Sequence, residues 1–361
     1  MQFLLWFAFI AFVFVVLALD LGLFNREAKV IGARQALRFT GILVAIAIGF
    51  SGVVYYLYAN AIGGFGSHLV MERGHQVVRT LSGSEAAWQY LAGYLLELSL
   101  STDNVFVIAL IFKYFKVPGK FQHRVLLWGI IGALLLRGLI IWIGAIALAK
   151  FSWFMYVFGG LLIISAIKLM RTKDGAHVDP EREYVVRIAR RLYPVSPTFD
   201  GERFFTKIEK PGAPGVMIGA MTPLFLALLV VETTDVLFAF DSIPAVFGVT
   251  QDPFLVFTSN VFAILGLRSL YFALASLISM FRYLEKCLVL LLFYIGAKMI
   301  ACEYFDWHPH PAVALGPIFL VLGVGVLASI VAAPPLTSKD DIALPEELGE
   351  TDADGNPIER A

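Results

Sequence analysis

The chain has 361 residues, of which 59% are hydrophobic and only 16% are charged. A soluble globular domain is closer to half apolar and a quarter charged, so the composition excludes an ordinary soluble protein and indicates an integral membrane protein. The formal net charge is zero, which gives no indication of a nucleic-acid partner, and none is expected.

Nine apolar runs are long enough to cross a bilayer as helices. The first run starts at Met1 without a basic segment or a small-residue cleavage site, so we expect it to remain as a span. The predicted fold class is therefore an all-α integral membrane protein with about nine transmembrane helices. The runs cover residues 2–24, 38–59, 86–112, 124–149, 151–170, 216–241, 254–280, 284–302 and 311–332.

The connections between the apolar runs are alternately rich and poor in lysine and arginine. The connections 25–38, 113–124 and 171–213 are rich in basic residues, whereas 60–85 and 242–253 hold few or none. Cytoplasmic loops of membrane proteins carry the excess of Lys and Arg. We therefore expect the N-terminus outside and the C-terminus in the cytoplasm.

The segments outside the apolar runs carry local signals of their own. Ser82 and Glu85 have capping-box spacing at the start of the third run, so Glu85 is expected to be structural. A short helix is expected from Asp179-Pro180 to Arg191, and its basic side is either an ordinary cytosolic surface or a contact with anionic lipid. Its apolar side would hold Val185, Val186, Ile188, Ala189 and Leu192.

An internal repeat relates two groups of three apolar runs. Thr102-Asp103 matches Thr234-Asp235, Arg137 matches Arg268, and Lys168 matches Lys298, at offsets of 132, 131 and 130 residues. Runs three to five therefore repeat as runs six to eight. Because each unit has an odd number of spans, the second unit is expected to be inverted, which is a transporter architecture. A second register, which pairs Asp103-Asn104 with Asp241-Ser242, stays open.

The repeat divides the chain into seven predicted parts. Two N-terminal helices occupy 1–60, an outer loop 61–85, repeat unit one 86–170, a cytosolic loop 171–213, repeat unit two 214–302, the last helix 303–332, and an acidic, disordered cytosolic tail 333–361.

Each repeat unit contains an acidic stretch inside an apolar run, Glu97–Ile108 and Glu232–Pro244. Ionisable residues at membrane depth are costly and typically line a path for an ion or a proton. On an ideal helix Glu97, Ser101 and Asn104 share one face, as do Glu232 and Asp235. Pro244 removes one helical hydrogen bond, so a local break is expected there.

The side chains of these stretches are hard oxygen ligands. Carboxylate, amide and hydroxyl oxygens suit Mn²⁺, Mg²⁺ or Ca²⁺ better than Zn²⁺ or Cu⁺, and the six histidines lie in loops or at helix ends. An alternative is that the intramembrane residues Arg137 and Arg268 each neutralise an aspartate in a buried pair. Five carboxylates face two guanidinium groups, so the surplus of acids favours an ion path.

Four strings resemble the TerC family of integral membrane proteins, and its Alx-like members most closely. They are ELSLSTDNVFVI at 97–108, TPLFLALLVVETTDVLFAFDSIPAVF at 222–247, DPFLVFTSNVFAILGLRSLYF at 252–272, and LDLGLFNREA at 19–28. The resemblance implies divalent metal efflux, chiefly of manganese, in a bacterial inner membrane, and names such as tellurite-resistance protein or redox modulator. By position, it implies metal-binding roles for Glu97, Asp103, Asn104, Glu232, Asp235 and Asp241, and Arg137 and Arg268 are expected to balance their charge.

The expected function is Mn²⁺ export by alternating access, with no permanently bound cofactor and no enzyme activity. Moving two positive charges outward against about 100 mV costs roughly 4.6 kcal/mol. The chain has no GxxxxGK[ST] nucleotide-binding motif, so coupling to inward proton movement is expected. Alternatives are another divalent ion such as Ca²⁺, or a membrane scaffold for tellurite or envelope-stress resistance. The oligomeric state stays open.

Overall fold

The computed structural model describes residues 2–24, 33–72, 75–171, 184–210, 213–277, 284–305, 307 and 311–331. The described part of the chain is mostly helical. Its helices are α1 (Gln2–Phe24), α2 (Ala33–Ala59), α3 (Gly83–Tyr114), α4 (Gly119–Lys150), α5 (Phe154–Arg171), α6 (Tyr184–Leu192), α7 (Pro223–Phe247), α8 (Pro253–Leu277), α9 (Leu284–Phe305) and α10 (Pro311–Val331), with a short 3₁₀ turn at Ile62–Gly64.

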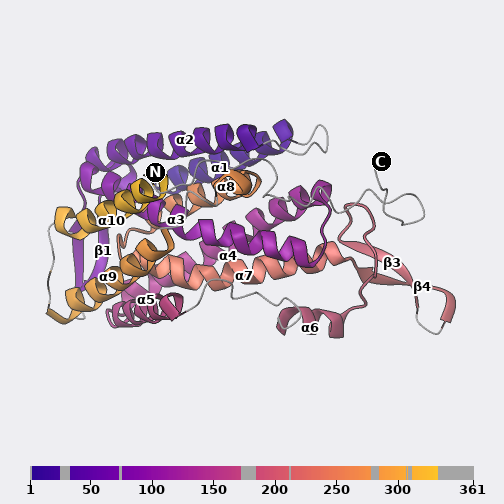
Figure 1. The fold of residues 1–361 in the computed structure, drawn as a ribbon. Coiled ribbons are helices and arrows are strands. Elements are labelled where there is room, and N and C mark those ends of the chain that lie inside the picture. Colours follow the sequence, from indigo (N-terminus) through magenta and orange to yellow (C-terminus); the bar gives the residue numbers. More distant parts are fainter. Residues whose placement is uncertain are drawn as a thin grey trace.

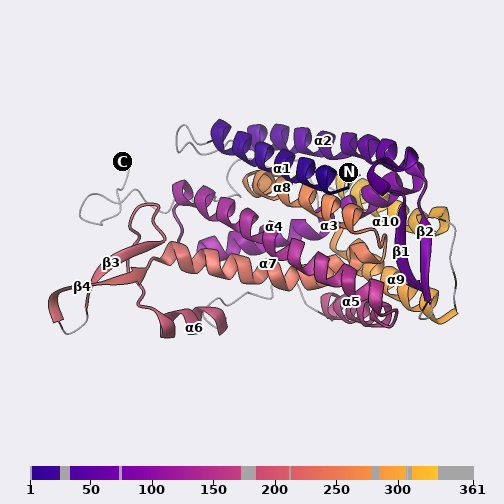
Figure 2. The same ribbon diagram turned by 180° about the vertical axis from the view of Figure 1, so that it is seen from behind.

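Two antiparallel hairpins stand at opposite ends of the helical bundle. Strands β1 (Ser67–Glu72) and β2 (His75–Thr80) form one, and β3 (Phe205–Lys210) and β4 (Ala213–Met221) form the other. In Figure 1 the β1–β2 hairpin closes the end where α3 begins, whereas the β3–β4 hairpin leads into α7 at the other end. Helices α3 and α7 therefore enter the bundle from opposite ends, and the reverse view in Figure 2 shows the same arrangement.

The exposed surface of the long helices is apolar while a charge lies inside, which is the distribution expected for an apolar solvent. On α4, the side chains of Leu135 and Trp142 are 71% and 63% exposed, whereas Arg137 is 1% exposed. Six helices in the described part, namely α2, α4, α5, α7, α8 and α9, are long and apolar enough to span a membrane, and α1 and α10 carry shorter apolar stretches. The predicted count of nine spans stays a prediction.

The structure corrects two predictions around the sixth apolar run. Residues 216–221, expected to be helical, belong to strand β4, and the helix begins only at Pro223. The prediction of a helix break at Pro244 is also wrong, because α7 continues through this proline to Phe247. The lost hydrogen bond falls in the last turn, where few further helical bonds depend on it. The predicted all-α fold also did not include the two β-hairpins that the structure contains.

Helix α6 overlaps the predicted short helix and ends one residue after Arg191, and the first predicted residues, 179–183, lie outside the described residues. Val186 and Ala189 are buried against α7 and its neighbours, as expected. Ile188 and Leu192 are 43% and 77% exposed, so the apolar side of α6 is narrower than predicted. The capping box at the start of α3 is confirmed, because Ser82 and Glu85 each accept a hydrogen bond from the other's backbone N–H.

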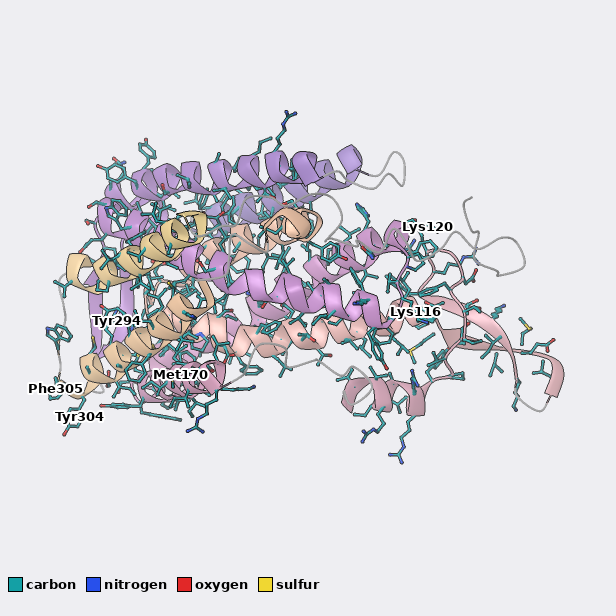
Figure 3. All side chains as sticks on the ribbon, viewed as in Figure 1. Lys116, Lys120, Met170, Tyr294, Tyr304 and Phe305 are labelled. Atoms are coloured by element: carbon teal, nitrogen blue, oxygen red, sulfur yellow. The ribbon has the colours of Figure 1, made fainter. Side chains whose placement is uncertain are left out.

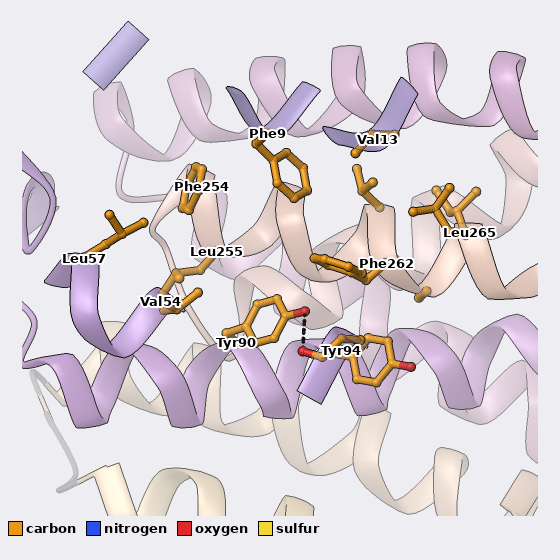
Figure 4. Close-up of a cluster of buried hydrophobic side chains, with 14 of the residues drawn as sticks. Phe9, Val13, Val54, Leu57, Tyr90, Tyr94, Phe254, Leu255, Phe262 and Leu265 are labelled. Carbon is orange, nitrogen blue, oxygen red and sulfur yellow. Dashed lines mark hydrogen bonds between the residues drawn. The ribbon is translucent and has the colours of Figure 1, made fainter. Parts of the chain in front are cut away.

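An aromatic cluster packs α1 and α2 against α3 and α8 (Figure 4). The rings of Phe9 and Phe262 lie 5.9 Å apart between α1 and α8, and Tyr90 of α3 donates a hydrogen bond of 3.1 Å to the carbonyl oxygen of Ala47. Buried aromatic side chains contribute large apolar areas, and the tyrosine hydroxyl needs a partner when it is buried. This cluster covers one side of α3, which carries the first acidic stretch.

The two ends of the bundle differ in their side chains (Figure 3). Lys116 and Lys120 lie at the end that carries the β3–β4 hairpin, whereas Tyr304 and Phe305 lie at the opposite end. On that side Lys298 donates a hydrogen bond of 2.8 Å to the carbonyl oxygen of Gly248, where α7 ends. A cation is favourable at a helix C-terminus.

Helices α5 and α9 approach each other most closely at two glycines. A Cβ added to Gly159 would lie 2.8 Å from the carbonyl oxygen of Gly296, and a Cβ on Gly296 would lie 2.7 Å from that of Gly159. Small residues at such positions let membrane helices pack closely. The adjacent Gly160 has no atom within 4 Å of its added Cβ.

We predict that Gly159→Ala lowers the free energy of unfolding in detergent by about 1–3 kcal/mol, because the new methyl group overpacks the α5–α9 contact. The matched variant Gly160→Ala adds the same methyl group to open space and should be neutral or raise stability by up to about 1 kcal/mol. Melting of the two purified variants measures this difference. Equal melting temperatures would contradict the α5–α9 packing.

Candidate functional site

Arg137 of α4 is a charged side chain buried at the centre of the bundle. Its Nε and Nη2 atoms donate to the two carboxylate oxygens of Asp235 on α7, at 3.0 and 2.9 Å, and Nη1 donates to Glu97 Oε1 on α3. The side chain of Glu97 is 0% exposed and that of Asp235 is 12% exposed. One guanidinium group therefore joins a carboxylate from each acidic stretch, and its contact with Asp235 has the bidentate geometry that makes such pairs strong.

Two neutral side chains complete the surroundings of this guanidinium group. Nη1 lies 3.1 Å from Asn260 Oδ1 on α8 and 3.3 Å from Ser242 Oγ on α7. Helices α3, α4, α7 and α8 thus all contribute to one polar cluster. A buried ion pair is tolerated only when additional hydrogen bonds satisfy its remaining polar atoms, and Asn260 and Ser242 supply such bonds.

The face of α3 that carries Glu97 points into the protein, as the helical spacing predicts. Glu97 and Ser101 are fully buried and Asn104 is 5% exposed. Close packing of α3 on α8 occurs one turn earlier, where a Cβ on Gly93 would lie 3.1 Å from Ser259 Oγ. The absence of a side chain at Gly93 lets α3 approach α8 beside the polar cluster.

Glu232 lies on the same face of α7 as Asp235, one turn before it. Its carboxylate rests against α4 at Gly132, where any added Cβ would overlap it. Its Oε2 atom is buried without a hydrogen-bond partner in the described part of the chain. Gly132 therefore provides the room for a third carboxylate beside the Arg137 cluster.

Asp241 has a separate partner. Its Oδ1 atom accepts a hydrogen bond of 2.5 Å from Ser165 Oγ on α5, whereas the adjacent Ser242 contacts Arg137. The structure thus brings Glu97 and Asp235 together, places Glu232 beside them, and directs Asp241 to α5. The side chains of Asp103 and Arg268 lie outside the described residues, so the register of the repeat stays open.

Several buried oxygen and nitrogen atoms on α3 and α8 have unused bonding capacity. Glu97 Oε2, Ser101 Oγ and Asn260 Nδ2 are buried without a hydrogen-bond partner among the residues that the structure describes. Buried polar groups normally have partners, so such atoms call for an explanation. No three His, Cys, Asp or Glu side chains within the described ranges are grouped closely enough to hold a metal. With Arg137 in place, the carboxylates bind the guanidinium group.

Sequence reasoning did not predict the contacts of four residues of this region: Ser165, Gly132, Ser242 and Asn260. Asn260 was detectable as an amide inside an apolar run, where a polar side chain usually has a partner on another helix. Ser242 and Ser165 carried a weaker signal, because serine in a helix commonly bonds its own preceding turn. Gly132 carried no signal of its role, since its importance depends on which helix packs against it.

Comparison with known proteins identifies relatives along most of the chain. The sequence model of the integral membrane protein TerC family matches residues 82–335. An uncharacterized membrane protein of Myxococcus xanthus, STKORF319, is 42% identical over 336 residues, which cover 93% of this chain and 95% of that protein.

Two further relatives carry more informative names. Alx of Escherichia coli K12, called a membrane-bound redox modulator, is 37% identical over 320 residues, covering 88% of this chain and 92% of that protein. The thylakoid membrane protein TERC of Arabidopsis thaliana is 43% identical over 248 residues, covering 69% of this chain and 62% of that protein. No solved structure matches the chain.

Removal of the Arg137 side chain should be far more costly than removal of an exposed arginine on the same helix. We predict that Arg137→Ala lowers the free energy of unfolding by about 3–5 kcal/mol, because it leaves the buried Glu97 carboxylate and the partly buried Asp235 carboxylate without their cation. Arg124 forms an exposed pair with Glu202 at 3.3 Å, with exposures of 39% and 52%, so Arg124→Ala should cost about 1 kcal/mol or less. Denaturant unfolding in detergent compares the two, and similar losses would contradict the buried cluster.

Proposed function

Because the chain belongs to the TerC family of integral membrane proteins, we propose that it exports a divalent metal ion, Mn²⁺, across the bacterial inner membrane. The observation that carries this proposal is the convergence of Glu97 and Asp235 on one buried point. They come from α3 and α7, which enter the bundle from opposite ends. Ionisable residues buried in a membrane protein typically mark an ion or proton pathway.

The donor atoms in this region suit a hard divalent cation. Glu97, Asp235 and Glu232 offer carboxylate oxygens, and Ser101, Ser242 and Asn260 offer neutral ones. Mn²⁺, Mg²⁺ and Ca²⁺ prefer such oxygen ligands. Glu232, Asp235 and Asp241 keep partial exposure while Glu97 is buried, so the acids of α7 would meet an entering ion first.

The helix packing supports alternating access between two inverted units. We propose that α3, α4 and α5 form one unit and that α7, α8 and α9 form the other. An inversion makes the α3–α8 contact equivalent to the α4–α7 contact, and both pairs pack together. The α5–α9 pair would then lie across the symmetry axis. A site at the interface of such repeats can be exposed to either side by rocking of one unit against the other.

Transport direction and energy follow from the charge distribution and the membrane potential. We place the β3–β4 end, near Lys116 and Lys120, in the cytoplasm, with the N-terminus outside and the C-terminus inside. Outward movement of two charges against about 100 mV costs roughly 4.6 kcal/mol. Protons that move inward through the same carboxylates would supply this energy, since each carboxylate can exchange a proton for a share of the metal.

A redox role in the sense of the name given to Alx has less support. The two cysteines of the chain, Cys287 and Cys302, both lie on α9. Fifteen residues of helix separate them by about 22 Å, which is too far for a disulfide. Transport of another divalent ion such as Ca²⁺ and a scaffold role in tellurite or envelope-stress resistance are the remaining alternatives.

We predict that Glu97→Gln and Asp235→Asn each reduce Mn²⁺ flux by a factor of about ten or more, equivalent to about 1.4 kcal/mol of binding. The measurement is Mn²⁺ transport by the purified chain in proteoliposomes with an imposed proton gradient. Glu85→Gln is the matched control, because Glu85 caps α3 away from the cluster, and it should retain flux.

Unchanged flux in Glu97→Gln and Asp235→Asn would contradict the assignment of these residues. Suppression of Mn²⁺ flux by excess Ca²⁺ would favour the calcium alternative. Absence of any metal flux in protein-only liposomes would favour a scaffold.

A further inference from the structure

We propose that Arg137 occupies the position of the transported cation in the conformation observed, and that its charge sets the site to accept a divalent ion. This inference rests on the proposed function and identifies how the same site chooses its ion. We infer that a divalent ion and the guanidinium group bind the same oxygens of Glu97 and Asp235, so the ion and the guanidinium group cannot both be bound there at once.

The hydrogen-bond geometry around Arg137 supports an exchangeable position. A guanidinium Nη atom carries two hydrogens, yet Nη1 lies near three acceptors, on Glu97, Ser242 and Asn260. At the same time Glu97 Oε2 is a buried carboxylate oxygen without a partner among the described residues. The cluster therefore contains more acceptor atoms than Arg137 can satisfy, as expected for a site that also binds a cation with a larger coordination number.

Glu232 is the acceptor to which Arg137 can move. Because Gly132 meets Glu232 and Arg137 pairs with Asp235, helices α4 and α7 run in the same direction at this contact. Glu232 precedes Asp235 by three residues, which is about 4.5 Å along the helix axis. Its Oε2 atom is buried and has no partner in the described part. A shift of the guanidinium group by about one turn would satisfy that atom and release Glu97 and Asp235.

The charges of the cluster match an ion of charge two. When ionised, Glu97, Asp235 and Glu232 together carry three negative charges and Arg137 carries one positive charge, which leaves a deficit of two. A divalent ion neutralises this deficit, whereas a monovalent or trivalent ion leaves an uncompensated buried charge, which is costly. Asp241 is not counted, because it bonds to Ser165 on α5.

Arg137 also gives the empty site a neutralising partner. Once the metal leaves, the guanidinium group returns to Glu97 and Asp235, which is the arrangement in the structure. These two carboxylates therefore always have a cation as a partner. The return of the unloaded protein would otherwise carry two unpaired carboxylates through an apolar environment.

The test compares the affinities for Mn²⁺ and Tb³⁺ of four forms of the full chain in detergent, by calorimetry. The net charge of Glu97, Asp235, Glu232 and Arg137 is −2 in the wild type when all four are ionised. It becomes −3 in Arg137→Gln and −1 in Glu232→Gln, and the double variant returns it to −2. We expect the Tb³⁺ to Mn²⁺ affinity ratio to rise about tenfold or more in Arg137→Gln, to fall similarly in Glu232→Gln, and to return toward wild type in the double variant. Mn²⁺ should also raise the melting temperature of Arg137→Gln more than that of wild type, because the metal replaces the lost cation.

Arg124→Gln is the control, since Arg124 is exposed on the same helix, and its ratio should equal that of wild type. If Arg137→Gln does not fold, the opposite shift in Glu232→Gln carries the test. If the wild type binds Mn²⁺ but all forms have the same ratio of Tb³⁺ to Mn²⁺ affinity, the proposed role of Arg137 is overturned and the proposed function is not. Absence of Mn²⁺ binding in every form would overturn the proposed function as well.

Discussion

The structure depends on one buried charge, the guanidinium group of Arg137, and on the two carboxylates that neutralise it. A charged group taken out of water loses several kcal/mol of solvation, which only close, well-oriented partners can offset. Those partners lie on different helices: Glu97 on α3, Asp235 on α7 and the amide of Asn260 on α8. The helices α3, α4, α7 and α8 must therefore meet at one point, and the apolar surfaces of the other helices cover the outside.

Small residues allow these helices to come close enough for the charged groups to meet. Gly93 lies against Ser259 where α3 packs on α8, Gly132 makes room for the Glu232 carboxylate, and Gly159 faces Gly296 between α5 and α9. In a membrane, helix association depends on such close packing and on polar contacts between helices. The same contacts that stabilise the bundle thus bring Glu97 of α3 and Asp235 of α7 to one guanidinium group.

Much of this fold follows from elementary features of the sequence. The positions of the long helices follow from the lengths of the apolar runs, and the inward face of Glu97, Ser101 and Asn104 follows from helical spacing. Residues 216–221 were assigned wrongly, because a short apolar strand that leads into an apolar helix has no composition boundary. The partners of the acids required the fold, since spacing along α7 does not determine that Asp235 faces Arg137 while Asp241 faces Ser165. Neutral partners such as Ser242 look the same in sequence as residues that only bond their own helix.

The most direct test of this account is an experimental structure of the protein with bound Mn²⁺, in which anomalous scattering locates the metal. The account predicts a single strong peak between Glu97 and Asp235, with oxygen atoms of both residues at about 2.0–2.6 Å and with the Arg137 guanidinium group moved onto Glu232. A metal bound elsewhere, with Arg137 still paired to both Glu97 and Asp235, would contradict it.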